Sequence, residues 1–345
     1  MEVSETASPQ NAVSVIVPTL NEEGNVAPLI EELERALDGR CQSYEIIVVD
    51  DGSTDKTLSR LEEELETRSH VPLRVLQHRT NFGQTAALAT GFRAARADVI
   101  VTLDGDLQND PADIPGLLTH LREGADVVCG WRRQRQEGPI RQIPSLLAAR
   151  VVRWLTGLEV HDVGCTLRAY RREIVDDLDL WGEMHRFIPA LCLAVGARID
   201  EMEVAHRPRF KGETKYGRTG LRRMFRVLLD LVTLSVVTRY RGRPIRMYGW
   251  WAGGAALAAV ATAATARFAG PDTGTIVGLC LLLAYAGALL LGVGASAELA
   301  ARSYAGAAAR GPGYVRRELR SDGWEKQWDA ARDGSVVGLT GSGRR

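Results

Sequence analysis

Two aspartates, Asp104 and Asp106, are separated by a single glycine. In an extended segment residues i and i+2 point the same way, so both carboxylates can face one point. Such a pair suits Mg²⁺ or Mn²⁺, which usually also takes substrate phosphates and water, and Gln108 can add a carbonyl oxygen. Asp and Gly are also ordinary turn residues. The run DVIVTL before the pair and LQNDP after it nevertheless favour a metal site.

A second acidic pair, Asp50 and Asp51, opens the sequence DDGS after the apolar run EIIVV. One interpretation is a turn whose aspartate caps the next helix. The other is a nucleoside site, in which a carboxylate accepts hydrogen bonds from base N–H groups or ribose hydroxyls. Two adjacent carboxylates repel each other more than a turn requires, which favours the nucleoside site. Glu22 and Glu23 follow an apolar run in the same way.

The elements that must position these residues alternate between strand and helix. Apolar, β-branched runs predict buried strands, at Ala12–Pro18, Glu45–Val49, Leu73–Gln77, Asp98–Leu103 and Asp126–Gly130. Helices are expected from a cap at Asn25 to near Gly39, from a cap at Asp55 to about Arg68, over Gly83–Arg96, and from Pro111 onward. This alternation predicts an α/β fold, a mostly parallel sheet with helices on both faces.

Polar clusters follow the first four expected strands, at residues 18–23, 50–55, 81–85 and 104–110. In parallel sheets ligands bind beyond the carboxyl ends of the strands. We therefore expect the four clusters to meet at one edge of the sheet and form one site.

Two uncharged stretches, Met247–Ala266 and Thr273–Ala297, predict a transmembrane hairpin with a short link at Arg267–Asp272, since a span needs about 20 apolar residues. The first stretch is rich in Ala and Gly and also suits a buried helix. Arginines flank the hairpin at 239, 241, 243 and 246 before it and at 302, 310, 316 and 317 after it. Such flanks predict that the large N-terminal part and both termini are cytosolic.

The segment 220–240 combines arginines at 222, 223 and 226 with a long apolar run. It suits a juxtamembrane helix on the membrane surface as well as an ordinary core helix, and the nearby span favours the surface position. The expected domain order is a disordered N-terminus (1–11), a catalytic domain (12–215), a juxtamembrane helical region (216–246), the hairpin (247–297) and a partly disordered cytosolic tail (298–345).

Composition excludes several classes of partner. The 43 basic and 43 acidic residues cancel, which argues against nucleic acid because phosphate backbones require a basic surplus. The five cysteines show no CxxC spacing, so we expect reduced thiols and no zinc site. No GxxxxGK[ST] motif is present, which argues against a coupled ATPase. A homo-oligomer is left open.

Several segments, taken in order, resemble the family 2 glycosyltransferases: VSVIVPTLNEE, VVDDGSTDKT, NFGQTAALATGF, TLDGDLQNDP, DVGCTLRAYRREI, MHRFIPAL and HRPRFKGETKYG. They are most similar to the branch that uses polyprenyl phosphate acceptors, the dolichol-phosphate mannosyltransferases and bacterial undecaprenyl-phosphate glycosyltransferases. The resemblance covers about residues 12 to 245. It implies a GT-A, Rossmann-like fold, a nucleotide-sugar donor linked to UDP or GDP, a divalent metal and inversion at the anomeric carbon.

The resemblance also implies roles for single residues. The nucleotide-binding set is Pro18, Leu20, Glu22, Asp50, Asp51, Asn81, Gly83, Asp104 and Gly105. The metal set is Asp104, Asp106 and Gln108. The acceptor-phosphate set is Arg132, Arg141, Ser145, His206 and Arg209. The catalytic set is Asp106, Asp162, Arg168 and Lys215.

Two departures from the family pattern concern these sets. Members often have SKY where this chain has Thr214-Lys215-Tyr216, which keeps the hydroxyl. They often have GFR where it has Cys165-Thr166-Leu167-Arg168, which leaves the shape of the sugar pocket open.

The expected reaction transfers a hexose-type sugar to undecaprenyl or dolichyl phosphate at the cytosolic membrane face. A phosphate monoester has a second pKa near 6, so it is already ionised and needs no strong base. It needs orientation, to which the arginine fork is suited. Asp162 can be a base, an acceptor for a sugar hydroxyl or the partner of Arg168. The alternatives are transfer to a glycan or lipid hydroxyl, and a non-catalytic nucleotide-sugar-binding scaffold.

Overall fold

The computed structural model describes residues 12–41, 43–133, 153, 157–180, 182–208, 244–269, 273–308 and 314–321. The chain divides into two compact units. The first contains residues 1–222 together with 314–345, and the second contains residues 223–313. Each unit is described by itself below.

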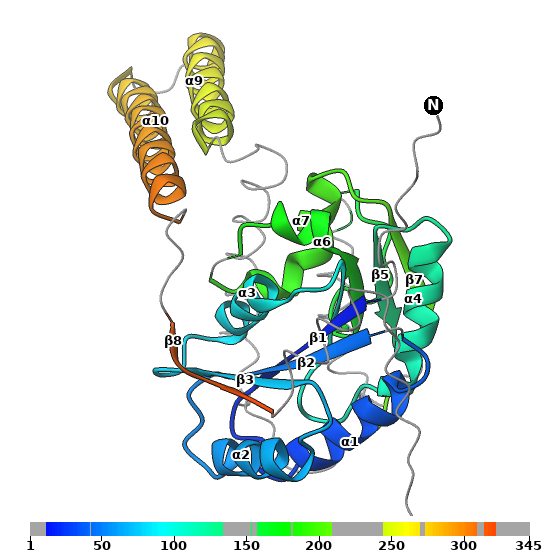
Figure 1. The fold of residues 1–345 in the computed structure, drawn as a ribbon. Coiled ribbons are helices and arrows are strands. Elements are labelled where there is room, and N and C mark those ends of the chain that lie inside the picture. Colours follow the sequence, from blue (N-terminus) through cyan, green and yellow to red (C-terminus); the bar gives the residue numbers. More distant parts are fainter. Residues whose placement is uncertain are drawn as a thin grey trace, which may run out of the picture. The chain divides into compact units, whose positions relative to one another are not determined.

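The first unit is built on an eight-stranded sheet in the order β7-β5-β6-β4-β1-β2-β3-β8 (Figure 1). Its strands are β1 (Ala12–Thr19), β2 (Ser43–Asp50), β3 (Leu73–His78), β4 (Val99–Thr102), β5 (Val127–Trp131), β6 (Arg168–Arg171), β7 (Ile199–Glu203) and β8 (Val315–Arg320). Strands β1 to β4 run parallel. Their carboxyl ends therefore share one edge, as the polar clusters predicted.

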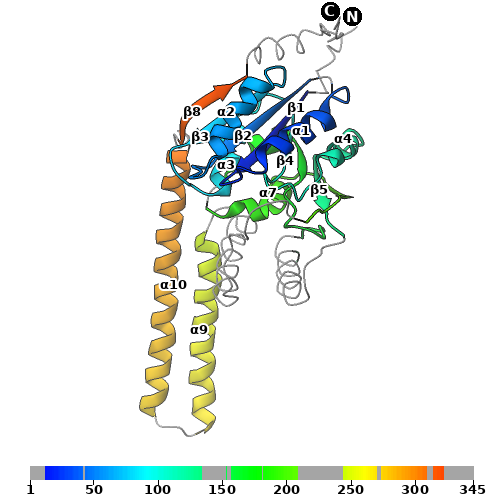
Figure 2. The same cartoon turned by 90° about the horizontal axis from the view of Figure 1, so that it is seen from below.

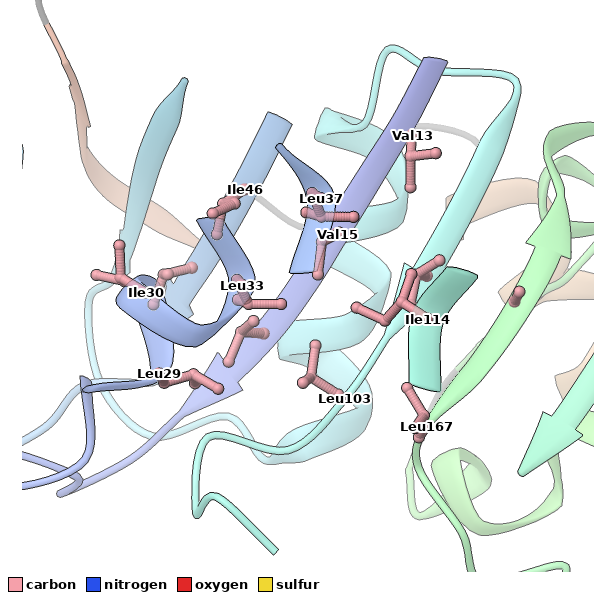
Figure 3. Close-up of a cluster of buried hydrophobic side chains, with 14 of the residues drawn as sticks. Val13, Val15, Leu29, Ile30, Leu33, Leu37, Ile46, Leu103, Ile114 and Leu167 are labelled. Atoms are coloured by element: carbon pink, nitrogen blue, oxygen red, sulfur yellow. The ribbon is translucent and has the colours of Figure 1, made fainter. Parts of the chain in front are cut away.

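Helices cover both faces of this sheet. They are α1 (Val26–Leu37), α2 (Thr57–Thr67), α3 (Gln84–Ala94), α4 (Ile114–Arg122), α6 (Arg172–Asp176) and α7 (Ile188–Ala194), with short 3₁₀ turns η1 (Pro111–Asp113) and η2 (Met184–Phe187). Side chains alternate along a strand, so Val15 joins the core under α1 and α4 (Figure 3), whereas Ile16 packs against Gly91 of α3 on the other face.

The five expected strands and the four helices between them are confirmed, but the sheet is mixed. The short strand β6 lies between β4 and β5 and runs antiparallel to both. Strand β8 was not expected in the tail, and it pairs antiparallel with β3. The helix after Asn25 starts as predicted, but the Asn25 side chain does not cap it. Its amide instead donates to Glu22 Oε2 at 2.6 Å.

The second unit contains α9 (Pro244–Ala269) and α10 (Thr273–Ala308), which Figure 2 shows side by side. Their contacts show that the two helices run antiparallel. Tyr248 of α9 contacts Gly294 of α10, and Ala252, further along α9, contacts Gly287, which comes earlier in α10. The stretch Gly274–Ala297 is long and apolar enough to cross a membrane, with a mean hydropathy of 2.5, and only 6% of its most apolar window is buried. Within the described residues it is the one helix that meets both conditions, so a two-span hairpin stays a prediction.

Candidate functional site

The edge beyond β4 carries the acidic pair. Gln84 Nε2 donates to Asp104 Oδ1 at 2.7 Å, and the Gln108 amide donates to Asp106 Oδ1 at 3.2 Å. A Cβ at position 105 would lie 2.9 Å from Thr19 Cγ2, so glycine lets the loop approach the end of β1. Burial, followed by the nearby charge of Asp106, raises the pKa of Asp104 to about 6.

Two neighbouring carboxylates, of which the buried Asp104 has a raised pKa, suit a bound divalent cation. Within the described ranges no group of three or more His, Cys, Asp or Glu side chains could hold a metal. A cation held by Asp104 and Asp106 would therefore take its other ligands from the side-chain carbonyl of Gln108, substrate phosphates or water, as Mg²⁺ usually does.

The loops after β1 and β2 are joined to each other. The Asn21 amide donates to Ser53 Oγ at 2.9 Å, and the Glu22 amide donates to Thr57 Oγ1 at 2.8 Å. Burial raises the pKa of Asp50, whose Oδ1 accepts from the Ser53 amide. The expected nucleotide-binding residues of these loops thus lie together at one edge of the sheet.

Asp51 is also held by the loop after β3. Its Oδ1 accepts from the Phe82 amide at 2.9 Å, and its Oδ2 accepts from the Gly83 amide at 2.8 Å. His78 Nδ1 lies 2.8 Å from Oδ1. Gly52 permits this approach, because a Cβ there would lie 2.5 Å from the Thr80 carbonyl carbon. The Asn81 side chain accepts from the Gly83 amide at 3.0 Å, so the predicted residues Asn81 and Gly83 lie beside Asp51.

Asp162 pairs with Arg132. Arg132 Nε donates to Asp162 Oδ2 at 2.7 Å, and Nη2 donates to Oδ1 at 3.1 Å. The two side chains are 17% and 3% exposed. Arg168 instead donates through Nη2 to the Val163 carbonyl at 2.7 Å. The ion pair described for Asp162 is therefore with Arg132, a residue predicted for the acceptor phosphate.

Arg168 lines a small pocket that also contains Asp104, the first aspartate of the acidic pair. The pocket is bounded by Pro18, Gln84, Leu88, Thr102, Leu103, Asp104, Thr166, Arg168, His185 and Ile188. The charges of Arg132 and Arg168 act to lower the pKa of Asp104 and partly offset the effect of burial. The site therefore combines both signs of charge, with the positive arginine side chains close to the acidic pair.

Gln84 and His185 are among the pocket residues to which sequence reasoning assigned no role. His185 Nδ1 lies 2.9 Å from Thr85 Oγ1, and burial lowers the pKa of His185 to about 3, so its ring is neutral near pH 7. Both lie in segments that carry the family resemblance, NFGQTAALATGF and MHRFIPAL. Those motifs were the available signal, and no role had been given to either side chain.

The remaining predicted residues fall into two groups. His206 forms an isolated antiparallel bridge with Asn109, and the Arg207 amide donates to the Gln108 carbonyl at 2.8 Å. This brings His206 to the loop that carries the acidic pair. Arg141, Ser145, Arg209 and Lys215 lie outside the described residues, as does the expected surface helix.

Comparisons with known proteins identify relatives of this chain. The sequence model described as glycosyl transferase family 2 matches residues 14–179. The chain is 40% identical to a dodecaprenyl-phosphate galacturonate synthase of Rhizobium johnstonii, covering 90% of this chain and 93% of that protein. It is 36% identical to an undecaprenyl-phosphate 4-deoxy-4-formamido-L-arabinose transferase of Pseudomonas aeruginosa, covering 91% and 92%. A solved glucosyl-3-phosphoglycerate synthase from Mycobacterium tuberculosis aligns with a TM-score of 0.49 and 22% identity, covering 64% of this chain and 79% of that one.

Proposed function

The chain belongs to glycosyl transferase family 2, and from that membership we propose that it transfers a sugar from a nucleotide-sugar donor to a polyprenyl phosphate. The observation that carries the acceptor class is the 40% identity, over 93% of its length, to a protein named for dodecaprenyl phosphate. A second relative named for undecaprenyl phosphate is similar over the same extent. The sugar is a hexose-type unit, and the nucleotide is UDP or GDP.

The donor is assigned to the edge beyond β1, β2 and β3. Pro18, Leu20, Glu22, Asp50 and Asp51 would contact the nucleoside, because their loops are tied together there. The Asp51 carboxylate is oriented by the amides of residues 82 and 83. Such an orientation would let it accept a hydrogen bond from a base or ribose without reorganising.

The diphosphate is assigned to the acidic pair. Asp104, Asp106 and Gln108 would hold Mg²⁺ or Mn²⁺, which would stabilise the charge that develops on the leaving diphosphate. Gln84 orients Asp104, and the Gln108 amide orients Asp106. The acceptor phosphate attacks the anomeric carbon from the opposite side with inversion, and its own negative charge makes a strong base unnecessary.

The acceptor phosphate is assigned to Arg132, Arg141, Ser145, His206 and Arg209. The bidentate pair with Asp162 fixes the Arg132 guanidinium and leaves its remaining N–H donors for a phosphate oxygen. Asp162 is then the partner that aims Arg132, Arg168 helps to balance the charge of the acidic pair, and Lys215 completes the catalytic set. The proposed catalytic domain spans residues 12–215, and strand β8 from the later part of the chain completes its sheet.

The acceptor class is tested by offering prenyl phosphate and the matching prenol, each with a radiolabelled nucleotide sugar. We expect label only in the prenyl phosphate, because the arginines recognise a phosphate. Equal labelling of both, or labelling of the prenol alone, would establish the alternative of a hydroxyl acceptor. No labelling, combined with retained nucleotide-sugar binding, would support a scaffold.

An Arg141→Ala variant refines this test. We expect transfer to prenyl phosphate to fall by roughly one to two orders of magnitude, because a charge-assisted hydrogen bond is worth about 1.5–3 kcal/mol. Donor binding, measured by calorimetry, should stay unchanged. Arg133→Ala is the matched control, since Arg133 forms a surface pair with Glu203 and its side chain is 67% exposed. Equal losses in both variants would contradict a direct contact at Arg141.

The topology proposal places two membrane crossings between residues 246 and 298, with both flanking segments in the cytosol. Strand β8 follows α10 in the chain and yet pairs with β3. Any membrane crossings between them must therefore be even in number. The sparse burial of Gly274–Ala297 also supports a helix in lipid rather than in a soluble core.

Cysteine labelling tests this topology in a cysteine-free background. Ser321 is buried, and its hydroxyl donates a hydrogen bond to the Val71 carbonyl. The exposed Arg316 is therefore the better position for an introduced cysteine in the segment after α10. We expect an impermeant thiol reagent applied from outside the cell to label Asp272→Cys and to spare Arg316→Cys. The reverse pattern, or labelling of both, would refute two crossings with cytosolic ends.

A further inference from the structure

The chain returns to the first unit after α10 and completes the sheet. Strand β8 pairs with β3 in a register that sets Leu76 opposite Glu318 and His78 opposite Val315, with an irregularity between Gln77 and His78. Only residues 309–313 separate the end of α10 from Tyr314, which directly precedes β8. Tyr314 itself lies beside the end of β3, where its carbonyl meets the Arg79 amide.

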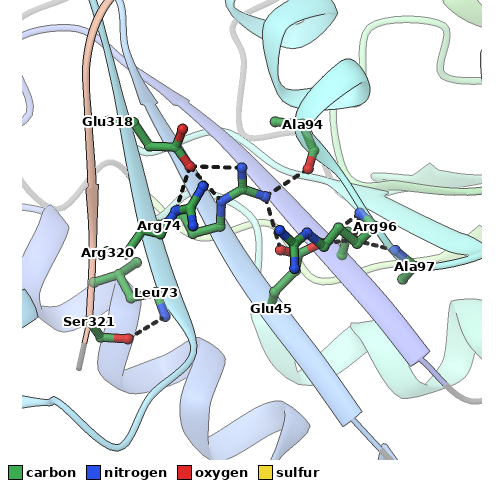
Figure 4. Close-up of polar contacts among 10 residues, drawn as sticks. Glu45, Leu73, Arg74, Ala94, Arg96, Ala97, Glu318, Arg320 and Ser321 are labelled. Carbon is green, nitrogen blue, oxygen red and sulfur yellow. Dashed lines mark hydrogen bonds and ion pairs between the residues drawn. The ribbon is translucent and has the colours of Figure 1, made fainter. Parts of the chain in front are cut away.

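An ion pair between the buried Arg74 of β3 and Glu318 of β8 fixes this register (Figure 4). Arg74 donates to Glu318 Oε1 through Nη2 at 2.9 Å, and its side chain is 7% exposed. The same guanidinium donates to the Ala94 carbonyl at 2.7 Å and lies 3.3 Å from Glu45, which is fully buried. Shifting β8 by one residue would move Glu318 to the other face of the sheet and leave Arg74 without that partner. Tyr314 is thus held in one place.

Tyr314 packs on the loop that follows β3. Its carbonyl accepts from the Arg79 amide at 3.1 Å. Its ring centroid lies 4.5 Å from that of Phe82 and 5.7 Å from that of His78. Phe82 and His78 are themselves in edge-on contact at 5.7 Å. The three rings form one cluster, in which Tyr314 is the member contributed by the tail.

The other two residues of this cluster hold Asp51, His78 through its ring and Phe82 through its backbone amide. His78 Nδ1 lies 2.8 Å from Asp51 Oδ1, and His78 Nε2 lies 3.0 Å from Thr90 Oγ1. The Phe82 amide donates to the same Asp51 oxygen. Asp51 is 4% exposed, so its orientation depends on these contacts. A change in the packing of Tyr314 would therefore be transmitted to Asp51 through His78 and through Phe82, each of which contacts both residues.

We propose that Tyr314 is a positioning residue for the donor nucleoside, acting through Phe82 and His78 on the carboxylate of Asp51. This inference rests on the proposed function, in which Asp51 contacts the nucleoside. Donor affinity is then coupled to the docking of β8, the segment that follows the second helix of the apolar hairpin. The residues proposed for the acceptor phosphate are not members of this ring cluster, so acceptor binding is expected to be unaffected.

The test uses the full-length enzyme in detergent with UDP and GDP, each with Mn²⁺, as calorimetric probes. We expect Tyr314→Ala to weaken binding of the preferred nucleotide about three- to tenfold, the range expected for loss of an aromatic contact. Tyr314→Phe should bind within about twofold of wild type. In transfer assays the donor KM should rise in Tyr314→Ala, with the acceptor KM and kcat unchanged.

The matched control is Arg317→Ala, on the same strand. Arg317 pairs with Glu62 on the surface, and its side chain is 55% exposed. Hydrogen exchange adds a readout independent of turnover, because the Phe82 and Gly83 amides donate to Asp51 and should exchange faster in Tyr314→Ala. Tyr314→Leu, which keeps bulk without the ring, serves if the alanine variant does not fold.

Two results would overturn the inference alone: unchanged nucleotide affinity and amide exchange in Tyr314→Ala, or an equal loss of affinity in Arg317→Ala. A wild-type enzyme that binds neither nucleotide would overturn the proposed function as well.

Discussion

An Asp106→Asn variant is expected to lose turnover by about three orders of magnitude or more. A metal at the leaving diphosphate is worth several kcal/mol, and each 1.36 kcal/mol changes a rate tenfold. The fold should survive, because asparagine keeps the oxygen that accepts from the Gln108 amide. Asp104→Asn should behave alike, since its oxygen can still accept from Gln84. Single-turnover kinetics and thermal unfolding measure the two effects separately.

Asp98→Asn is the matched control for these variants. Asp98 is exposed at the other end of β4, directly before its first residue, so its loss should leave turnover unchanged. EDTA should reproduce the Asp106→Asn result in the wild-type enzyme, and added Mn²⁺ should reverse it. Undiminished transfer in metal-free buffer would show that the acidic pair does not act through a metal.

Asp162→Asn is expected to lower the free energy of unfolding by about 3–5 kcal/mol. Removing one partner of a buried ion pair leaves the other charge uncompensated, and Asp162 and Arg132 are 3% and 17% exposed. The double variant Arg132→Met/Asp162→Asn should recover part of the loss, because the unpaired charge is then gone. Urea unfolding of the detergent-solubilised protein measures both.

The exposed pair Arg133–Glu203 provides the comparison. Its side chains are 67% and 54% exposed, and removing such a pair changes stability by about 0–1 kcal/mol. If Asp162→Asn abolished transfer at full stability, Asp162 would act on the substrate as a base or a sugar-hydroxyl acceptor. The ion pair would then be incidental to its role.

The parallel half of the fold could be predicted because its signals are local. Each of β1 to β4 is an apolar run that ends in a polar cluster, and parallel pairing places those clusters at one edge. Strands β6 (RAYR) and β8 (VRRELR) carry no such run. Their stability comes from partners far along the chain, such as Arg74 for Glu318. No periodicity in their own sequence could indicate that pairing.

The candidate site likewise has features with a local sequence signal and features that depend on contacts between distant residues. The acidic pair was recognisable from its spacing and from the strand before it. The pairing of Asp162 with Arg132 was not, because 30 positions separate them and several arginines were available. The contact of Gln84 with Asp104 likewise depends on how α3 lies against the end of β4. Residue types identify candidate groups, whereas the fold determines which of them touch.

The late position of β8 in the chain sets an order for biosynthesis. The Leu73 amide lies 3.4 Å from Ser321 Oγ, a contact between residues 248 positions apart. At translation rates of about 5–20 residues per second, β8 is synthesised roughly 12–50 s after β3. During that interval β3 is an unpaired sheet edge, the kind of surface that invites aggregation. The catalytic domain can complete its sheet only after both apolar helices have been synthesised, so a ribosome stalled within α10 would carry an enzyme that is still open at this edge.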